Sequence, residues 1–106
     1  MKKVFISQAM NGKTQETILA ERAEAIGKAK EIFGEIEVID SYFEDYNPEK
    51  GCVPLKYLAK SLELMADADI VFFAKGWREA RGCRIEFECA KAYGIHQCSC
   101  DGWIDK

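Results

Sequence analysis

A glutamate stands where a buried strand gives way to a helix. The apolar run Ile70 to Ala74 predicts a buried strand, and the residues after it predict a helix that begins near Gly82. Glu86 would then lie in the first turn of this helix, just past the carboxyl end of the strand, where open parallel sheets bind ligands. A carboxylate in this position either offsets the charge of the helix N-terminus or is a catalytic carboxylate. Position alone favours the first interpretation.

Two arginines precede this glutamate. Arg81 and Arg84 flank Gly82 and Cys83, and both lie within five residues of Glu86. Each arginine is either a solvated surface charge or a donor of charge-assisted hydrogen bonds to a ligand. Because two of them stand so close to the carboxylate, we favour a phosphate or another acidic ligand.

A polar loop follows the first predicted strand. Lys3 to Ser7 is a short apolar run that is typical of a buried parallel strand, and Asn11-Gly12 after it is a loop signal. In a doubly wound sheet the loops after the first and third strands often share one edge. The polar loop and the Glu86 region should therefore converge.

The rest of the chain alternates between helix and strand patterns. Helices are expected from Thr14 or Thr17 to about Phe33 and over Leu55 to Ala66, and further strands over Glu35 to Asp40 and Ile95 to Ser99. This order predicts a three-layer α/β/α sandwich with a small parallel sheet of about four strands, flavodoxin-like or Rossmann-like, in a single domain over residues 1–106.

Apolar residues at helical spacing predict which face of each helix enters the core. These residues are Ile18, Leu19, Ala23, Ile26, Ala29 and Ile32 or Phe33 in the first helix, Leu55, Leu58, Leu62 and Met65 in the second, and Ile85, Cys89 and Ala92 in the third. Ser61 lies beside the second of these stripes, and Glu86 lies one residue off the third.

The stretch Ser41 to Pro54 is irregular and rich in aromatic and acidic residues. It is either a surface loop or a substrate lid, in which Tyr42, Phe43 and Tyr46 would stack on a flat ring. In the tail, Trp103 and Ile104 are expected to fold back on the body of the domain.

Composition excludes several classes of protein. A hydrophobic content of 48% and a charged content of 31% are typical of a folded, soluble domain, and the formal net charge of −3 argues against binding to a nucleic-acid polymer. No apolar run approaches the roughly 20 residues of a membrane span, and we expect no signal peptide. The five cysteines show no CxxC spacing, so reduced thiols in a cytoplasmic protein are favoured over a metal site that would include Cys98 and Cys100.

The segments FISQAMNG, ADIVFFAKGW and GCRIEFECAKAYG, in this order and spacing, resemble the nucleoside 2-deoxyribosyltransferase-like family, and within it a small bacterial and phage branch. The resemblance implies action on the N-glycosidic bond of 2′-deoxyribonucleosides or their 5′-monophosphates. Gly82, Glu86 and Ala90 match the motif of the nucleophilic glutamate, so Glu86 would form a glycosyl-enzyme ester that water or a second base resolves.

The resemblance also implies a binding site for the sugar or phosphate, with no cofactor and no metal. The expected substrate-binding residues are Ser7, Gln8, Met10, Asn11, Gly12, Ser61, Gly76, Trp77, Arg81, Gly82 and Arg84, with Lys13 the nearest cation of the first loop. Backbone N–H groups at a helix N-terminus suit a phosphate. Related sites are completed across subunits, so a homodimer or larger homo-oligomer is expected.

Several positions depart from the family pattern. Ser61 and Ala80 stand where active members carry aspartates, Phe5 replaces a tyrosine, and Arg84 replaces a glycine. The sequence also stops after the fourth predicted strand, whereas active relatives usually continue.

The departures leave an alternative open, which is a non-catalytic module of the same fold that senses or sequesters a nucleotide. A third interpretation is that the last helix is mainly an oligomer interface, with Trp77 and Tyr93 buried by a partner chain.

Overall fold

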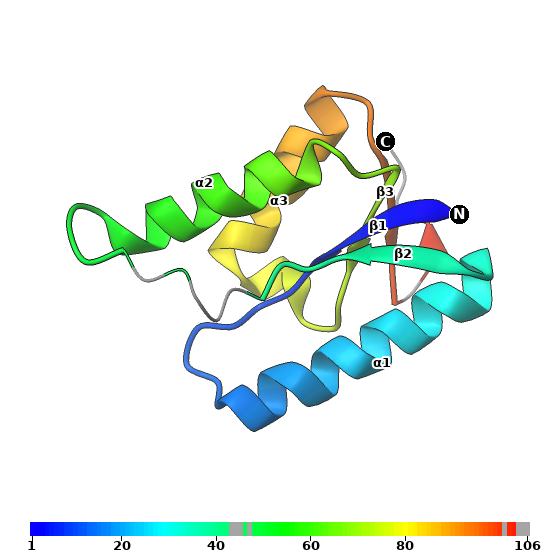
Figure 1. The fold of residues 1–106 in the computed structure, drawn as a ribbon, viewed down its shortest axis with the longest axis horizontal. Helices are drawn as coiled ribbons and strands as arrows, with labels where there is room; N and C mark the ends of the chain where they lie inside the picture. The colour runs from blue at the N-terminus through cyan, green and yellow to red at the C-terminus, as the bar shows by residue number, and fades with distance from the viewer. Residues whose placement is uncertain (43–45, 47, 101, 104–106) are drawn as a thin grey trace.

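The computed structural model describes residues 1–42, 46, 48–100 and 102–103. Its strands are β1 (Lys2–Ser7), β2 (Ile36–Ile39), β3 (Ile70–Phe73), β4 (His96–Ser99) and β5 (Gly102–Trp103). They form one sheet in the order β2-β1-β3-β4-β5 (Figure 1). The first four strands are parallel, and β5 pairs antiparallel with β4.

Helices cover both faces of this sheet. In Figure 1, α1 (Gln15–Phe33) lies on one face, and α2 (Val53–Met65) and α3 (Arg81–Ala92) lie on the other. A short 3-10 helix, η1 (Trp77–Glu79), joins β3 to α3. The predicted three-layer sandwich with four parallel strands is confirmed. Strand β5 is an addition at Trp103, and Ile104 lies outside the described residues.

The two faces of the sheet carry separate halves of the core, because successive residues of a strand point to opposite faces. Val4 and Ile6 of β1 pack on the α1 side, whereas Phe5 packs with residues of α2 and α3. All four residues of β3 are buried. Strands buried on both faces have continuous apolar sequences, which is why β1 and β3 could be predicted from the sequence.

Helix α1 begins and ends where the sequence predicts. The Thr17 backbone N–H donates to Thr14 Oγ1 at 3.1 Å, so Thr14 is the N-cap. At the other end Gly34 has a φ of 77°, which a residue without a Cβ adopts at little cost, and its N–H donates to the Lys30 carbonyl.

The predicted core-facing stripe of α3 is wrong at Ile85 and Ala92 and correct at Cys89, which is partly buried against the core. Ile85 is 37% exposed and Ala92 is also exposed, whereas Cys83, Glu86 and Ala90 are buried. The buried face of α3 is therefore centred about one residue later in the sequence than expected. Glu86 can be buried because the hydroxyl of Ser7 on β1 donates a hydrogen bond to its carboxyl group.

The stripes of the other two helices are correct only in part. Leu19, Ile32 and Leu55 are 42%, 46% and 59% exposed, and Ala23 is also exposed. In α1 the buried positions include Arg22 and Ala25, which the apolar pattern does not select.

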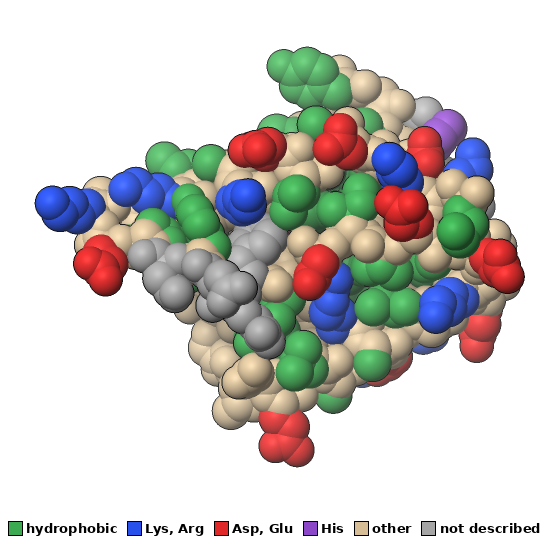
Figure 2. All heavy atoms as spheres, viewed as in Figure 1, with side chains coloured by type: hydrophobic (Ala, Val, Ile, Leu, Met, Phe, Trp, Pro, Cys, Tyr) green, Lys and Arg blue, Asp and Glu red, His purple; other side chains and the backbone are tan. Residues whose placement is uncertain are grey.

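The surface carries charges of both signs. On the face shown in Figure 2, Lys and Arg side chains are interspersed with Asp and Glu side chains. Among the described residues, no helix has both the length and the apolar character that crossing a membrane requires.

Candidate functional site

Ser7 and Glu86 meet at the carboxyl end of the parallel strands. Ser7 is the last residue of β1 and is 1% exposed, while Glu86 of α3 is 6% exposed. The Ser7 hydroxyl donates a hydrogen bond to Glu86 Oε1 at 2.6 Å. Because α3 begins at Arg81, Glu86 lies in its second turn and not in its first. The end of β1 and the Glu86 region do converge.

The surroundings of Glu86 favour its neutral form. Burial raises the pKa of Glu86 to about 7, and hydrogen bonds from Ser7 and Ser61 oppose the rise. The carboxyl group is therefore close to half ionised at neutral pH. Such a group can give up or take up a proton near the pH of the cell.

A cavity of about 670 Å³ lies beside Glu86. Its walls come from the loop after β1, from α2, from the turn before η1 and from the first turns of α3. The volume falls within the roughly 300–1,000 Å³ of small-molecule sites. The cavity lies at the edge where the segments after β1 and β3 leave for opposite faces, which is the usual ligand position in doubly wound sheets.

Most of the residues expected to bind a ligand surround this cavity. Its described walls include Gln8, Met10 and Asn11 from the first loop, Ser61 from α2, Gly76 from the turn, and Arg81, Gly82, Arg84 and Glu86 from α3. Ser7 contacts the cavity residue Glu86 through its hydrogen bond. Arg81 and Arg84 are exposed, and Ala80, the N-cap residue of α3, makes no side-chain capping hydrogen bond. Two cationic side chains therefore lie in the first turn of α3, at the cavity wall.

Three of the expected residues, Ser7, Gly12 and Trp77, are absent from the described cavity walls. Trp77 is 6% exposed because its ring packs against Phe73 and Phe87, with centroids 4.5 Å and 5.3 Å away. It is a core residue, and it is covered by its own chain and not by a partner. Tyr93, by contrast, is 84% exposed.

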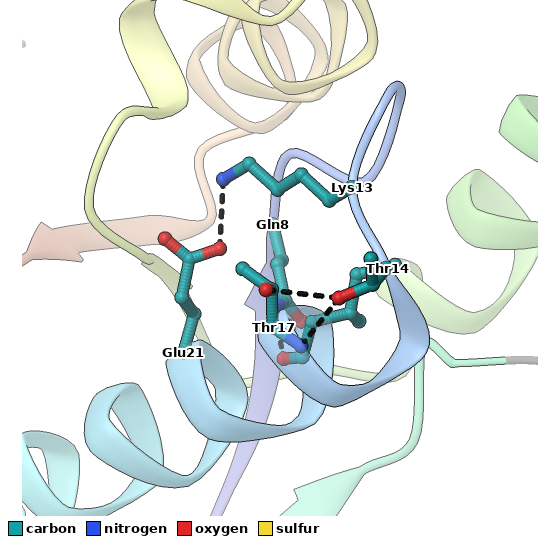
Figure 3. Close-up of polar contacts among 6 residues, drawn as sticks. Gln8, Lys13, Thr14, Thr17 and Glu21 are labelled. Carbon is teal, nitrogen blue, oxygen red and sulfur yellow. Dashed lines mark hydrogen bonds and ion pairs between the residues drawn. The ribbon is translucent and has the colours of Figure 1, made fainter.

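Side-chain contacts hold the first loop against α1 (Figure 3). Gln8 Nε2 donates to the Ile18 carbonyl at 2.6 Å, and Lys13 Nζ forms an ion pair with Glu21 Oε1 at 2.7 Å. Lys13 also lines the cavity. Its ammonium is therefore available to an anionic ligand only in competition with Glu21.

Some cavity residues were not expected from the sequence. Pro54, Tyr57 and Leu58 of α2 and Cys83 of α3 line the cavity. Cys83 could have been expected from its spacing, because it precedes Glu86 by three residues and positions i and i+3 lie on the same face of a helix. Tyr57 carried no comparable signal.

The expected lid aromatics are not in the described walls of the cavity. Tyr46 packs edge-to-face on Tyr57 with centroids 5.2 Å apart, and Phe43 lies outside the described residues. The Tyr57 hydroxyl donates to the Tyr46 carbonyl at 2.7 Å, which ties this stretch to the cavity wall.

The chain belongs to the family described as Domain of unknown function (DUF4406), whose model matches residues 2–98. The match runs from the start of β1 into β4 and includes every described residue of the cavity wall. No curated protein matches the chain. The family description names no activity.

Proposed function

We propose that the protein cleaves or transfers the N-glycosidic bond of 2′-deoxyribonucleosides or their 5′-monophosphates, with Glu86 as the nucleophile. The observation that carries the proposal is the buried Glu86 carboxyl group, held by Ser7 at 2.6 Å, at the wall of a cavity of about 670 Å³. The resemblance of the first loop and the Gly82 to Ala90 segment to the nucleoside 2-deoxyribosyltransferase-like family supports it.

The proposed reaction has two steps. In the first, an oxygen of the ionised Glu86 bonds to C1′ of the sugar while the bond between C1′ and the base nitrogen breaks. The base leaves with the electron pair of that bond and takes a proton from solvent. In the second, water or the nitrogen of another base attacks C1′, the ester bond breaks, and Glu86 regains its charge while the attacking group loses a proton.

The protein environment suits the charge changes of this reaction. The sugar becomes cation-like in the transition state, and a carboxylate fixed close to it lowers the energy of that state. Ser7 holds the carboxyl group in place, and Ser61 lines the same cavity. Arg81, Arg84 and Lys13 line the same cavity and give a 5′-phosphate cationic partners.

The second candidate is a nucleotide-binding module without catalysis. It is favoured by Ser61 and Ala80, which line the cavity at the two positions where active members of the family carry aspartates. The neutral side chains leave the site with less negative charge, which favours the binding of an anion.

A chromatographic assay tests the first candidate. The purified protein is incubated with a panel of deoxyribonucleosides and deoxyribonucleoside 5′-monophosphates, with and without an acceptor base. Wild type should release free base or form an exchanged nucleoside, Glu86→Gln should not, and Glu88→Gln, exposed on the same helix, should match wild type. Turnover retained in Glu86→Gln contradicts the proposal. Absence of turnover in every form, with thermal stabilisation by one nucleotide, supports the binding module.

We also propose a homo-oligomer, a dimer or larger, in the cytoplasm. Of the two aromatic residues considered for a partner contact, only Tyr93 has an exposed side chain. Sedimentation of wild type and Tyr93→Ala tests the assembly, and a wild-type monomer at high concentration contradicts it.

A further inference from the structure

Lys13 differs from Arg81 and Arg84, the other two cations of the described cavity wall. Lys13 Nζ forms an ion pair with Glu21 Oε1 of α1 at 2.7 Å, whereas no described carboxylate forms an ion pair with either arginine. We propose that Glu21 is a specificity-determining residue, an internal competitor that occupies the Lys13 ammonium until the phosphate of a ligand displaces it. The inference rests on the proposed function, in which the cavity takes a nucleoside or its 5′-monophosphate.

The Lys13 side chain belongs both to the cavity wall and to the ion pair. It extends from the first loop to Glu21 of α1 (Figure 3). A lysine ammonium is a compact charge on a flexible four-carbon chain. Torsions of that chain alone can therefore exchange the Glu21 carboxylate for an anion bound in the cavity.

The backbone of the first loop does not have to move in this exchange. The Lys13 backbone N–H donates to the Met10 carbonyl at 3.2 Å, and Gln8 Nε2 donates to the Ile18 carbonyl at 2.6 Å. Thr14, directly after Lys13, caps α1. These contacts hold the backbone on both sides of Lys13 and do not involve its ammonium.

The exchange should favour phosphate over carboxylate. The side chains of Lys13 and Glu21 are 28% and 26% exposed, so water partly screens their attraction. A phosphate monoester carries more negative charge than a carboxylate and has three strong acceptor oxygens. Arg81 and Arg84 on the same wall add cationic partners for it.

Glu21 should therefore act on phosphorylated ligands alone. Binding of a phosphate to Lys13 includes the cost of breaking the Lys13–Glu21 pair, whereas an unphosphorylated sugar or nucleoside leaves the pair intact. Removal of the Glu21 charge should thus increase the affinity for the phosphate and leave the affinity for the rest of the ligand unchanged.

The test compares wild type, Glu21→Gln and Glu16→Gln by ¹H–¹⁵N NMR titration at low ionic strength, with inorganic phosphate, 2-deoxyribose 5-phosphate and 2-deoxyribose as probes. Glu21→Gln should bind both phosphate-bearing probes about threefold more tightly than wild type, as expected for loss of a partly exposed ion pair. The response to 2-deoxyribose should be the same in both proteins. Glu16→Gln removes the same charge from an exposed position of α1, so it measures the general effect of net charge, which should be smaller.

The same change in a Lys13→Gln background identifies the route. If Glu21 acts by holding the Lys13 ammonium, Glu21→Gln should then gain no more affinity for phosphate than Glu16→Gln does. Lys13→Gln alone should bind phosphate less tightly than wild type. A gain for Glu21→Gln no larger than that for Glu16→Gln, a gain that persists in full without the Lys13 charge, or no phosphate binding by any form overturns the proposal. The titration involves no turnover, so a failure of the proposed activity and a failure of this inference give different results.

Discussion

The hydroxyl of Ser7 and the carboxylate oxygen Oε1 of Glu86 lie 2.6 Å apart, although 79 positions separate them in the sequence. The contact exists because β1 and β3 are adjacent parallel strands, paired at Ser7 and Phe73, whose following segments leave for opposite faces of the sheet. An unpartnered ionised group in this position would cost several kcal/mol. The hydroxyl offsets part of this cost and leaves Glu86 able to ionise near neutral pH.

The first prediction concerns stability and pH. Glu86 has a pKa raised by burial from 4.5 to about 7 in the folded protein, so its contribution to stability is present below about pH 4.5 and is lost as pH rises through about 7. A shift of this size corresponds to about 3 kcal/mol. The free energy of unfolding of Glu86→Gln relative to wild type should therefore increase by this order between pH 4 and pH 9.

Urea unfolding at several pH values measures this difference. Glu88→Gln is the control, because its side chain is exposed on the same helix, and it should track the wild-type curve. A constant offset between Glu86→Gln and wild type across the pH range would mean that the carboxyl group does not titrate as its burial implies.

The second prediction concerns activity and pH. A nucleophile must be ionised, so kcat/KM for the cleaved nucleoside should rise with pH through about 7, the pKa of Glu86 in the free protein. Ser61→Ala removes a hydrogen bond that favours the ionised form, so its profile should move to higher pH. An acid limb centred near pH 4.5, as for an exposed glutamate, would show that another carboxylate reacts.

The strands and helix boundaries were predictable because local signals define them. The run VFI in β1 and the run IVFF in β3 are wholly apolar, and Thr14 and Gly34 mark the ends of α1. The faces of the helices were less predictable. Apolar periodicity selected Ile85 over Glu86 because it ranks residues by hydrophobicity. The face that is buried depends instead on the hydrogen bond that Ser7 of β1 donates to Glu86.

The site was predictable where residues follow the ends of strands. Where α2 supplies the wall, Ser61 was expected but Pro54, Tyr57 and Leu58 were missed. Gln8, Met10 and Asn11 follow β1 directly, so topology alone brings them to the ligand edge. Tyr57 reaches the same cavity from a helix whose position depends on packing of the whole domain. Trp77 was expected in the site from the family resemblance, but its large apolar ring is buried against Phe73 instead.

The third prediction concerns a second buried polar link. Arg22 Nη1 donates to Ser41 Oγ at 3.0 Å, and Ser41 Oγ donates to the Ile6 carbonyl at 2.6 Å. Ser41→Ala leaves a guanidinium N–H and a carbonyl unpaired in the interior, so we expect a loss of about 2 kcal/mol in the free energy of unfolding.

Asp40→Asn is the matched comparison. Asp40 Oδ1 lies 3.1 Å from Arg22 Nη2, but its side chain is 72% exposed, so the ion pair is screened by water and its loss should cost about 0.5 kcal/mol or less. Urea denaturation of both variants measures the two losses. A larger loss for Asp40→Asn than for Ser41→Ala would show that the ion pair, and not the buried link, holds α1 to the end of β2.

The last prediction compares two aromatic residues at either end of α3. Trp77 is 6% exposed and is packed between Phe73 and Phe87, with the Arg78 guanidinium 4.6 Å from its ring centroid. Trp77→Ala should lower the free energy of unfolding by about 3–5 kcal/mol. At protein concentrations too low for assembly, Tyr93→Ala should change it by about 0.5 kcal/mol or less, because Tyr93 is 84% exposed in the single chain. Urea unfolding at two protein concentrations measures both. A large, concentration-dependent loss for Tyr93→Ala would mean that another chain covers this side chain, as the proposed assembly allows.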